Sequence, residues 1–346
     1  MEPKHSSPSS SQSTFRPGEV VVVRSAAEIL ATLDDQGTKA GLPFMPEMME
    51  HIGKRFVVSR KVEKTCVDAS PYGMKEFNDN DVVFLEQLRC DGASHGGCGR
   101  ACMLFWKTAW LAAPGTAPPV AVDDGAMEEL RNRLITRRED GRYMCQSSDL
   151  EEATHKLSRF GRIWKCVRNV TQGNSSILAM GGMIVKPAWA RLWLRFFPRW
   201  PSGTNVKCPA ESLNLQPGEW VEVKSVEEIK ATLDATGKNR GLQFAYDLAW
   251  CCGRKFKIRS RLEHLIVERT GKYLDVRNSV LLEGITCPCR CVIGGCGRAD
   301  YIYWREIWLR KVPAPHAPMM PENGQIVPKA CCSSAGECTI PETVGR

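Results

Sequence analysis

Hydrophobic and polar residues form short patterned segments along the chain, and the same pattern occurs twice. Residues 20–23 are four consecutive valines, and residues 220–224 (WVEVK) alternate between apolar and polar. A period of two is typical of a half-buried strand, and a short apolar run is typical of a strand buried on both faces. A Pro-Gly pair lies just before each segment, at 17–18 and 217–218, and favours a turn. We therefore expect a strand to open each half of the chain.

A helix start follows each of these strands. Ser25 and Ser225 stand where an N-cap belongs, and a glutamate follows each serine three residues later. This spacing is that of a capping box, in which the serine and glutamate side chains accept hydrogen bonds from each other's backbone N–H groups. The pattern predicts a helix of about ten residues in each half, ending near Gly37 and Gly237.

The two halves match at a constant separation of 200 residues over their first thirty positions. The first half reads FRPGEVVVVRSAAEILATLDDQGTKAGLPF, and the second reads LQPGEWVEVKSVEEIKATLDATGKNRGLQF. Three later pairs also correspond: FLEQLRC with LLEGITC, GGCGRA with GGCGRA, and FWKTAWL with YWREIWL. Self-similarity of this kind indicates a tandem duplication, with residues 15–111 and 215–309 as copy one and copy two. In copy one we expect further strands at Arg55–Arg60, Val82–Leu88 and Met103–Trp106, with counterparts in copy two.

The sequence between and around the copies divides the chain into five parts. They are a polar leader expected to be disordered (1–14), repeat module 1 (15–112), a Pro/Ala-rich linker and helical connector (113–205), repeat module 2 (206–312) and a flexible tail (313–346). Periodic apolar residues predict connector helices at Met127–Arg138 and Leu150–Leu157. The apolar stretch at 177–197 contains three basic residues and a proline, which argues against a membrane span.

These elements predict an α+β protein made of two tandem small β-barrel modules with short helices, joined by a mainly helical connector. The segments PGEWVEVKS and GRKFKI resemble the opening strands of SH3-like barrels, of the type found in the β-subunit of nitrile hydratase. The whole chain resembles an uncharacterised bacterial protein family with a duplicated module that carries PGEWVEV, GLPFMPEM and RCDGxxHGGC motifs. The resemblance implies a fold for each module, and it implies no activity.

Composition narrows the class of protein only slightly. Of the 346 residues, 43% are hydrophobic and 25% are charged, as in ordinary soluble globular proteins. The net charge of +8 permits weak attraction to nucleic acid, but a solvated basic surface is the simpler interpretation. The leader lacks the apolar core of a secretory signal, so we expect a cytoplasmic protein.

Sixteen cysteines are many for a chain expected in a reducing compartment, where clustered cysteines favour metal or redox chemistry over structural disulfides. Copy one carries RCDGASHGGCGRAC, a loop whose glycines allow the backbone to fold tightly around a small ion. Our preferred zinc ligands are Cys66, Cys90, Cys98 and Cys102, since zinc prefers four sulfur or nitrogen ligands in a tetrahedron. His95 lies beside this set or replaces one of its thiolates. Free loop histidines are, however, more common than histidine ligands.

Copy two carries TCPCRCVIGGCGRAD, in which Cys287, Cys289, Cys291 and Cys296 fall within ten residues. Alignment of the copies places Asp300 opposite Cys102 and Ile266 opposite Cys66. The loss of these two thiols beside a gain of two new ones is the best internal argument for a metal in both copies. Zinc is the expected metal and an iron–sulfur cluster the less favoured one. Redox or disulfide chemistry and inert packing remain open alternatives.

The aromatic residues that follow each loop have two interpretations. Trp106 and Trp110, with Trp304 and Trp308 in copy two, could stack on nucleobases or form the core of each module, and their recurrence favours the core. No P-loop, zinc-protease or dinucleotide-binding motif occurs. The sequence thus favours a metal-stabilised, duplicated binding module for a protein partner. A metal-dependent enzyme, an accessory subunit of such an enzyme that uses the Cys/His loop, and a weak nucleic-acid binder are the alternatives.

Overall fold

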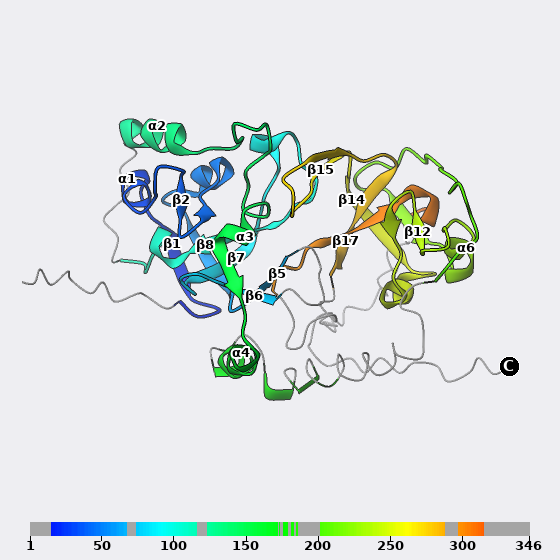
Figure 1. Cartoon of the computed structure of the whole chain (residues 1–346), viewed down its shortest axis with the longest axis horizontal. Coiled ribbons are helices and arrows are strands. Elements are labelled where there is room, and N and C mark those ends of the chain that lie inside the picture. Colours follow the sequence, from blue (N-terminus) through cyan, green and yellow to red (C-terminus); the bar gives the residue numbers. More distant parts are fainter. Residues whose placement is uncertain are drawn as a thin grey trace, which may run out of the picture. The chain divides into compact units, whose positions relative to one another are not determined.

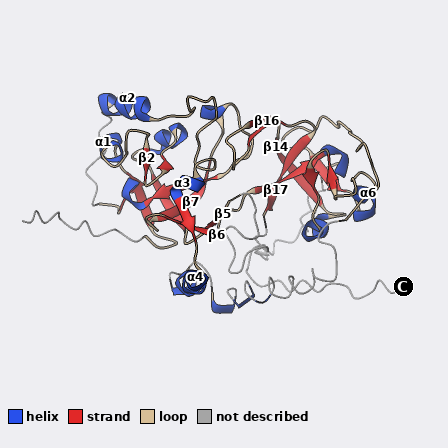
Figure 2. Ribbon diagram, viewed as in Figure 1, coloured by secondary structure: helices blue, strands red, loops and turns tan. Residues whose placement is uncertain are grey.

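A computed structural model gives the structure of the chain. It describes residues 15–67, 74–115, 123–171, a few residues between 173 and 185, 201–287 and 297–314. The described part consists of small antiparallel sheets with few helices (Figures 1 and 2). This architecture agrees with an α+β, barrel-like fold.

Copy one is built on a five-stranded antiparallel sheet. Its strands, in the order β8-β7-β4-β1-β9, are β8 (Met103–Lys107), β7 (Val82–Arg89), β4 (Arg55–Lys61), β1 (Val20–Val23) and β9 (Leu111–Ala112). Val21 and Val23 are fully buried, whereas Val20 is 44% exposed. The run of four valines therefore behaves as a strand with one buried face, and not as a strand buried on both faces.

Copy two contains a sheet with the corresponding strand order. It runs β18 (Tyr301–Arg305), β17 (Ser279–Thr286), β14 (Lys255–Arg261), β11 (Trp220–Val223) and β19 (Leu309–Lys311). The register of β4 against β7 shifts between Val58 and Arg60, and that of β14 against β17 shifts between Ile258 and Ser260. The irregularity in register thus lies at the same place in both sheets. The three strands predicted in copy one also agree with the observed strands to within one residue at each end.

Each copy adds short elements around its sheet. In copy one these are α1 (Ala26–Leu30), β2 (Thr38–Lys39), β3 (Leu42–Pro43), η1 (Pro46–His51), β5 (Thr65–Cys66), β6 (Met74–Phe77), η2 (Ala93–His95) and η3 (Thr108–Trp110). In copy two they are α6 (Val226–Lys230), β12 (Lys238–Asn239), β13 (Leu242–Gln243), η4 (Tyr246–Cys251), β15 (His264–Ile266), β16 (Tyr273–Asp275) and η5 (Glu306–Trp308).

The connector contains helices, as expected, but also a strand. It forms α2 (Asp124–Arg133), α3 (Leu150–Ala153), β10 (Thr154–Lys156) and α4 (Arg159–Thr171). The helix predicted over Leu150–Leu157 ends at Ala153, because the next three residues pair with β6. The predicted Met127–Arg138 helix begins three residues earlier and ends at Arg133.

The capping box is present in both copies, but the helix that follows it is shorter than expected. The side chains of Ser25 and Ser225 accept from the backbone N–H of Glu28 and Glu228. Both α1 and α6 are five residues long, and each continues into a turn rather than into a second helical turn. The prediction of about ten residues was therefore wrong in length and right in position.

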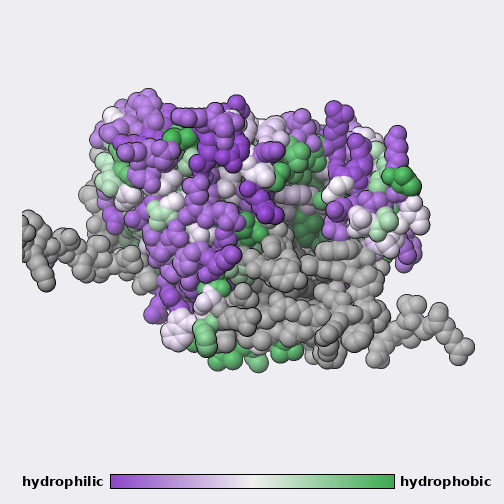
Figure 3. Space-filling view, viewed as in Figure 1, coloured by the Kyte–Doolittle hydropathy of each residue, from purple (hydrophilic) through white to green (hydrophobic). Residues whose placement is uncertain are grey.

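The tryptophans form the cores of the copies, as their recurrence suggested. Trp106, Trp110, Trp304 and Trp308 are each no more than 1% exposed. Phe44 packs edge-on against Trp110, and Phe244 packs edge-on against Trp308. Buried rings cannot stack on nucleobases, so this route to nucleic-acid binding is removed for these four residues. On the face of the molecule shown in Figure 3, the surface over α2 is mostly hydrophilic.

Among the described residues, no helix is both long enough and apolar enough to cross a membrane. Most of the apolar stretch at 177–197 lies outside the described residues.

Candidate metal centre

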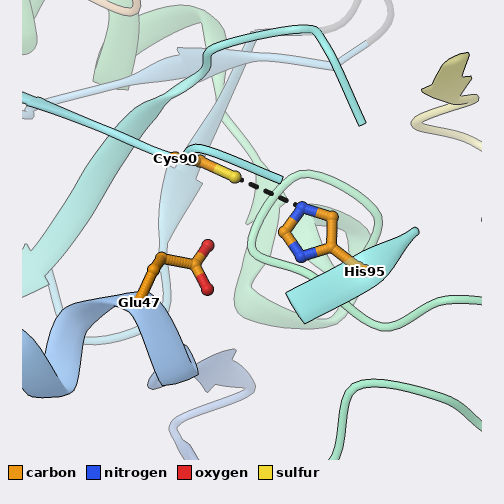
Figure 4. Close-up of side chains that lie close together, drawn as sticks. All are labelled: Glu47, Cys90 and His95. Carbon is orange, nitrogen blue, oxygen red and sulfur yellow. Dashed lines mark hydrogen bonds between the residues drawn. The ribbon is translucent and has the colours of Figure 1, made fainter. Parts of the chain in front are cut away.

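Three side chains from separate segments of copy one converge on one point (Figure 4). Glu47 comes from η1, Cys90 directly follows β7, and His95 ends η2. One ligand atom from each of these residues lies within 4.8 Å of the other two. Glu47 and Cys90 are partly buried and His95 is 1% exposed. A sulfur, an imidazole nitrogen and a carboxylate oxygen therefore share one sheltered site.

The loop that carries His95 turns tightly after Cys90. Gly92 has φ +75°, and a Cβ atom there would lie 2.2 Å from the carbonyl oxygen of Cys98. A side chain at this position is therefore excluded, and the glycine allows the loop to close on itself. The closure brings His95 back to Cys90, five residues earlier in the chain.

The hydrogen bonds of Ser94 indicate which ring nitrogen of His95 carries the proton. The hydroxyl of Ser94 donates to Oε2 of Glu47 (2.7 Å) and lies 3.0 Å from Nδ1 of His95. Since its single proton goes to Glu47, this hydroxyl accepts from Nδ1–H. Nε2 then carries the lone pair, and it faces the sulfur of Cys90 at 3.2 Å. The imidazole is thus held in the tautomer that a metal ligand requires.

The other carboxylate oxygen of Glu47 supports the same interpretation. Oε1 of Glu47 is buried and has no hydrogen-bond partner among the described residues. An unsatisfied buried acceptor costs about 1–3 kcal/mol, or more when charged. The cluster borders a cavity of ≈ 20 Å³, which is the space of roughly one water molecule or ion. The site therefore fits a small cation and excludes an organic substrate.

Two features of the site raise the pKa of the Cys90 thiol. Burial raises its pKa, and the negative charge of Glu47 raises it further. Burial also lowers the pKa of His95. A reactive or redox cysteine works as a thiolate and usually has a lowered pKa. The surroundings of Cys90 raise the pKa of its thiol instead, and an ion bound there would have to displace the thiol proton.

The structure places the remaining predicted ligands of copy one in two locations. Cys98 and Cys102 line the same small cavity as Cys90 and His95. Cys66 lies in β5, and its carbonyl oxygen accepts from Arg298. Within the described residues, no group of three or more potential ligand atoms mutually within 4.8 Å includes Cys66, Cys98 or Cys102. The structure therefore joins two of the five predicted residues, Cys90 and His95, with a carboxylate.

Two cysteines outside the loops, Cys145 and Cys251, are buried in the protein core. Cys145 is 7% exposed and burial raises its pKa to about 12. Cys251 is fully buried in η4.

In copy two, the backbone N–H of Cys287 donates to the carbonyl of Asp300. In copy one, Cys90 donates in the same way to Cys102. The loop base thus has the same backbone pairing in both copies. The three other cysteines of this loop, Cys289, Cys291 and Cys296, lie outside the described residues.

The two loop arginines form reciprocal contacts between the copies. Arg100 of copy one donates to the carbonyl of Ile266 (3.1 Å), and Arg298 of copy two donates to the carbonyl of Cys66 (2.8 Å). Both guanidinium groups also pair with Glu268, at 3.3 and 2.6 Å. Because Ile266 is the counterpart of Cys66, each GGCGRA loop contacts the equivalent strand of the other copy. The glycine-rich loops therefore join the copies in addition to carrying the cysteines.

Glu47 is the member of this candidate site that the sequence interpretation missed. It lies 43 positions before Cys90, and no spacing rule connects the two segments. The available signal was the acidic residue within GLPFMPEM, the second motif of the resemblance.

Comparisons with known proteins found no matching family model, curated protein or solved structure.

Proposed function

We propose that the chain is a metal-stabilised binding protein, built from two SH3-like modules that present surfaces to a partner protein. The observation that carries the proposal is the convergence of Glu47, Cys90 and His95 around an oriented imidazole nitrogen. Zinc is the favoured ion, because it accepts sulfur, nitrogen and carboxylate ligands at about 2.0–2.3 Å. Ligand atoms on such a tetrahedron are separated by roughly 3.3–3.7 Å. The 3.2 Å between Cys90 and His95 is close to this separation.

A structural role for the ion fits better than a catalytic one. Three residues supply ligands, and Cys98 or Cys102, both on the cavity wall, can supply the fourth. A closed four-ligand site is typical of structural zinc, whereas a catalytic site keeps a position open for substrate. The cavity of ≈ 20 Å³ leaves no such room. An ion in this position ties η1 to the loop after β7.

A second ion in copy two belongs to the same proposal. Cys287, Cys289, Cys291 and Cys296 would supply its ligands in place of a Glu/Cys/His set.

Elemental analysis of the purified chain tests the metal proposal. We expect close to two zinc ions per chain. The double variant Cys90→Ala/His95→Ala should retain about one ion, and its melting temperature should fall. Cys145→Ala is the matched control, because Cys145 lines the same cavity and is not a proposed ligand. Metal-free wild-type protein, or a metal content unchanged in the double variant, would refute the site.

A further inference from the structure

In copy one, a segment of the connector fills a groove between β3 and β8. The side-chain amide of Gln146 donates to the carbonyl oxygens of Pro43 (3.0 Å) and Phe105 (2.8 Å). Its oxygen accepts from the backbone N–H of Phe105 at 2.8 Å. Leu150 and Ala153, further along the segment, are fully buried in the core of copy one. The segment is therefore part of the fold of copy one.

The same segment also extends a sheet of copy one. β10 pairs antiparallel with β6, so that Thr154 lies opposite Phe77 and Lys156 lies opposite Lys75. The approach is close, because a Cβ atom on Gly41 would lie 2.7 Å from the carbonyl oxygen of Glu152. The connector thus acts as a bound peptide that is covalently attached. It combines a short helix with an added strand.

In the described part of the chain, no such segment fills the corresponding groove of copy two. β15 and β16 form a two-stranded sheet, and no third strand joins β16 among the described residues. Of the described residues, none has an atom within 4 Å of a Cβ atom placed on Gly241, the counterpart of Gly41. A cavity of ≈ 530 Å³ borders this glycine, which is within the usual range of ligand pockets.

The groove of copy two has apolar walls and an open strand edge. Four leucines line it: Leu242, Leu262, Leu265 and Leu274. Leu274, in β16, is 48% exposed. Hydrophobic surface is visible beside β15 in Figure 3. An exposed apolar strand edge is a template for pairing with another chain.

The charge of the groove differs between the copies. In copy one, the ammonium group of the buried Lys107 is paired with Asp79 (3.2 Å) and Asp81 (2.9 Å). In copy two, Arg305 takes the place of Lys107 and Asn278 takes the place of Asp81. The equivalence of Asn278 and Asp81 follows from matching backbone hydrogen bonds, from Thr108 to Asp81 and from Glu306 to Asn278.

Arg305 consequently lacks a counter-charge within the described part of the chain. Its guanidinium donates to three backbone carbonyls and to the hydroxyl of Ser279. Burial and the nearby Arg240 lower its pKa. Arg277 also lines the groove, and the one carboxylate among its described lining residues, Asp275, is hydrogen-bonded to His264. The groove therefore carries excess positive charge.

The occupant of the copy-one groove shows which peptide chemistry suits this geometry. One of its acidic residues, Glu151, faces a basic residue of the groove, Lys75 on β6, whereas Glu152 pairs with Arg138 of the connector itself. Three arginines line the open groove of copy two, Arg240, Arg277 and Arg305, and their charge favours an acidic peptide.

We propose that the groove of copy two binds an acidic peptide segment of a partner protein. The segment pairs as a strand with the free edge of β16, and its apolar side chains pack on the four leucines. Its carboxylates pair with Arg240, Arg277 and Arg305. This inference rests on the proposed role as a partner-binding protein, and it does not depend on the metal centre.

A labelled peptide with the sequence of residues 146–157, QSSDLEEATHKL, is the probe. Its binding to the full chain is measured by fluorescence polarisation. We expect saturable binding with a dissociation constant below about 1 mM, which weakens as salt is added. The tethered segment protects the groove of copy one, because an intramolecular ligand acts at an effective concentration of about millimolar or more.

The double variant Arg240→Glu/Arg277→Glu should weaken peptide binding roughly tenfold or more. Lys230→Glu is the control, because Lys230 is an exposed cation of the same copy outside the groove. Leu274→Asp should weaken binding as well. Metal content is measured in every sample. A loss of peptide binding that is caused by the altered groove can then be distinguished from one caused by loss of the metal ion.

Three results would overturn the proposal. They are no saturable binding up to about 1 mM, equal binding of the groove variant and the Lys230 control, and equal binding of a scrambled peptide of the same composition. Displacement of the peptide by a single-stranded oligonucleotide that itself binds more tightly would assign the groove to nucleic acid and would likewise overturn it.

Discussion

Ser94 has a single hydroxyl proton, and the direction in which that proton points decides the chemistry of the cluster. Donation to Glu47 leaves the oxygen of Ser94 as the acceptor for Nδ1–H of His95. The lone pair of Nε2 then faces Cys90. One hydroxyl therefore orients two of the three proposed ligands. Substitution of a residue that orients a metal ligand commonly lowers metal affinity, although the residue itself does not contact the metal.

Ser94→Ala should weaken zinc binding about tenfold or more, because His95 and Glu47 both lose their orienting partner. Competition with a chelator of known affinity measures the effect. Ser59→Ala is a suitable control, since the hydroxyl of Ser59 donates to a backbone carbonyl in the same copy and lies outside the cluster. Equal zinc affinity of the two variants would contradict the orienting role.

Single residues also show how far the sequence could predict the site. The loop composition identified Cys90 and His95, because local glycines and short spacing bring them together. Cys98 and Cys102 were placed near the site by the same reasoning, and both do line its cavity. Glu47 could not be found in this way, since a contact between η1 and the loop after β7 depends on how distant segments pack.

At the scale of elements, α1 and α6 depend strongly on their caps. Each helix is five residues long, which is far below the length at which an isolated helix is stable. The capping box supplies hydrogen bonds to two N–H groups that would otherwise lack partners. Glu28 also pairs with Arg24 at 2.7 Å. The cap therefore contributes a large share of what holds such a short helix in place.

The cap of α1 should make stability depend on acid pH. Burial alone would raise the pKa of Glu28, but hydrogen bonds from Ser25 and the charge of Arg24 lower it overall. A lowered pKa stabilises the folded state above the unfolded pKa, and that stability is lost as pH falls through the folded pKa. Glu28→Gln should therefore destabilise the chain near neutral pH and less so below about pH 4.

Chemical denaturation of wild type and Glu28→Gln at several pH values measures this difference. Ser25→Ala should cost about 1 kcal/mol. Asp35→Asn is the control, since Asp35 is fully exposed in its side chain. A loss of stability in Glu28→Gln that is the same at every pH would contradict the assignment.

The elements also show where local patterns stop being informative. The start of each helix was predictable because a capping box is a local signal. The strand β10 was not, because residues 154–156 pair with β6, which lies about eighty positions earlier. A short segment with mixed propensity takes the structure that its tertiary partner requires.

At the scale of the molecule, Glu268 links the two loop arginines. Its carboxylate is paired with Arg298 at 2.6 Å and with Arg100 at 3.3 Å, and its side chain is 2% exposed. Removal of one partner from a buried ion pair leaves an uncompensated charge and costs about 3–5 kcal/mol. Replacement of both partners by apolar residues is often neutral.

Arg298→Met should therefore destabilise the chain by about 3 kcal/mol or more, and Arg298→Met/Glu268→Met should lose less than the sum of the single variants. Urea denaturation followed by tryptophan fluorescence measures both. Arg310→Met is the control, because Arg310 makes exposed pairs with Glu222 and Glu228, and should cost no more than about 1 kcal/mol. Additive losses would show that the two residues do not act together.

The reciprocal loop contacts constrain how the halves can diverge. Where a surface meets its own counterpart, as in a two-fold dimer, one substitution alters both sides of the junction. Here the halves are covalently joined, yet the equivalent arginines of the two GGCGRA hexapeptides, Arg100 and Arg298, each hydrogen-bond to the other half. The six residues are identical in both halves, whereas the grooves, which face no counterpart, differ in charge and occupancy. The junction thus retains its two arginines although the residues that accept from them, Ile266 and Cys66, differ, because a backbone carbonyl can accept whatever side chain its residue carries.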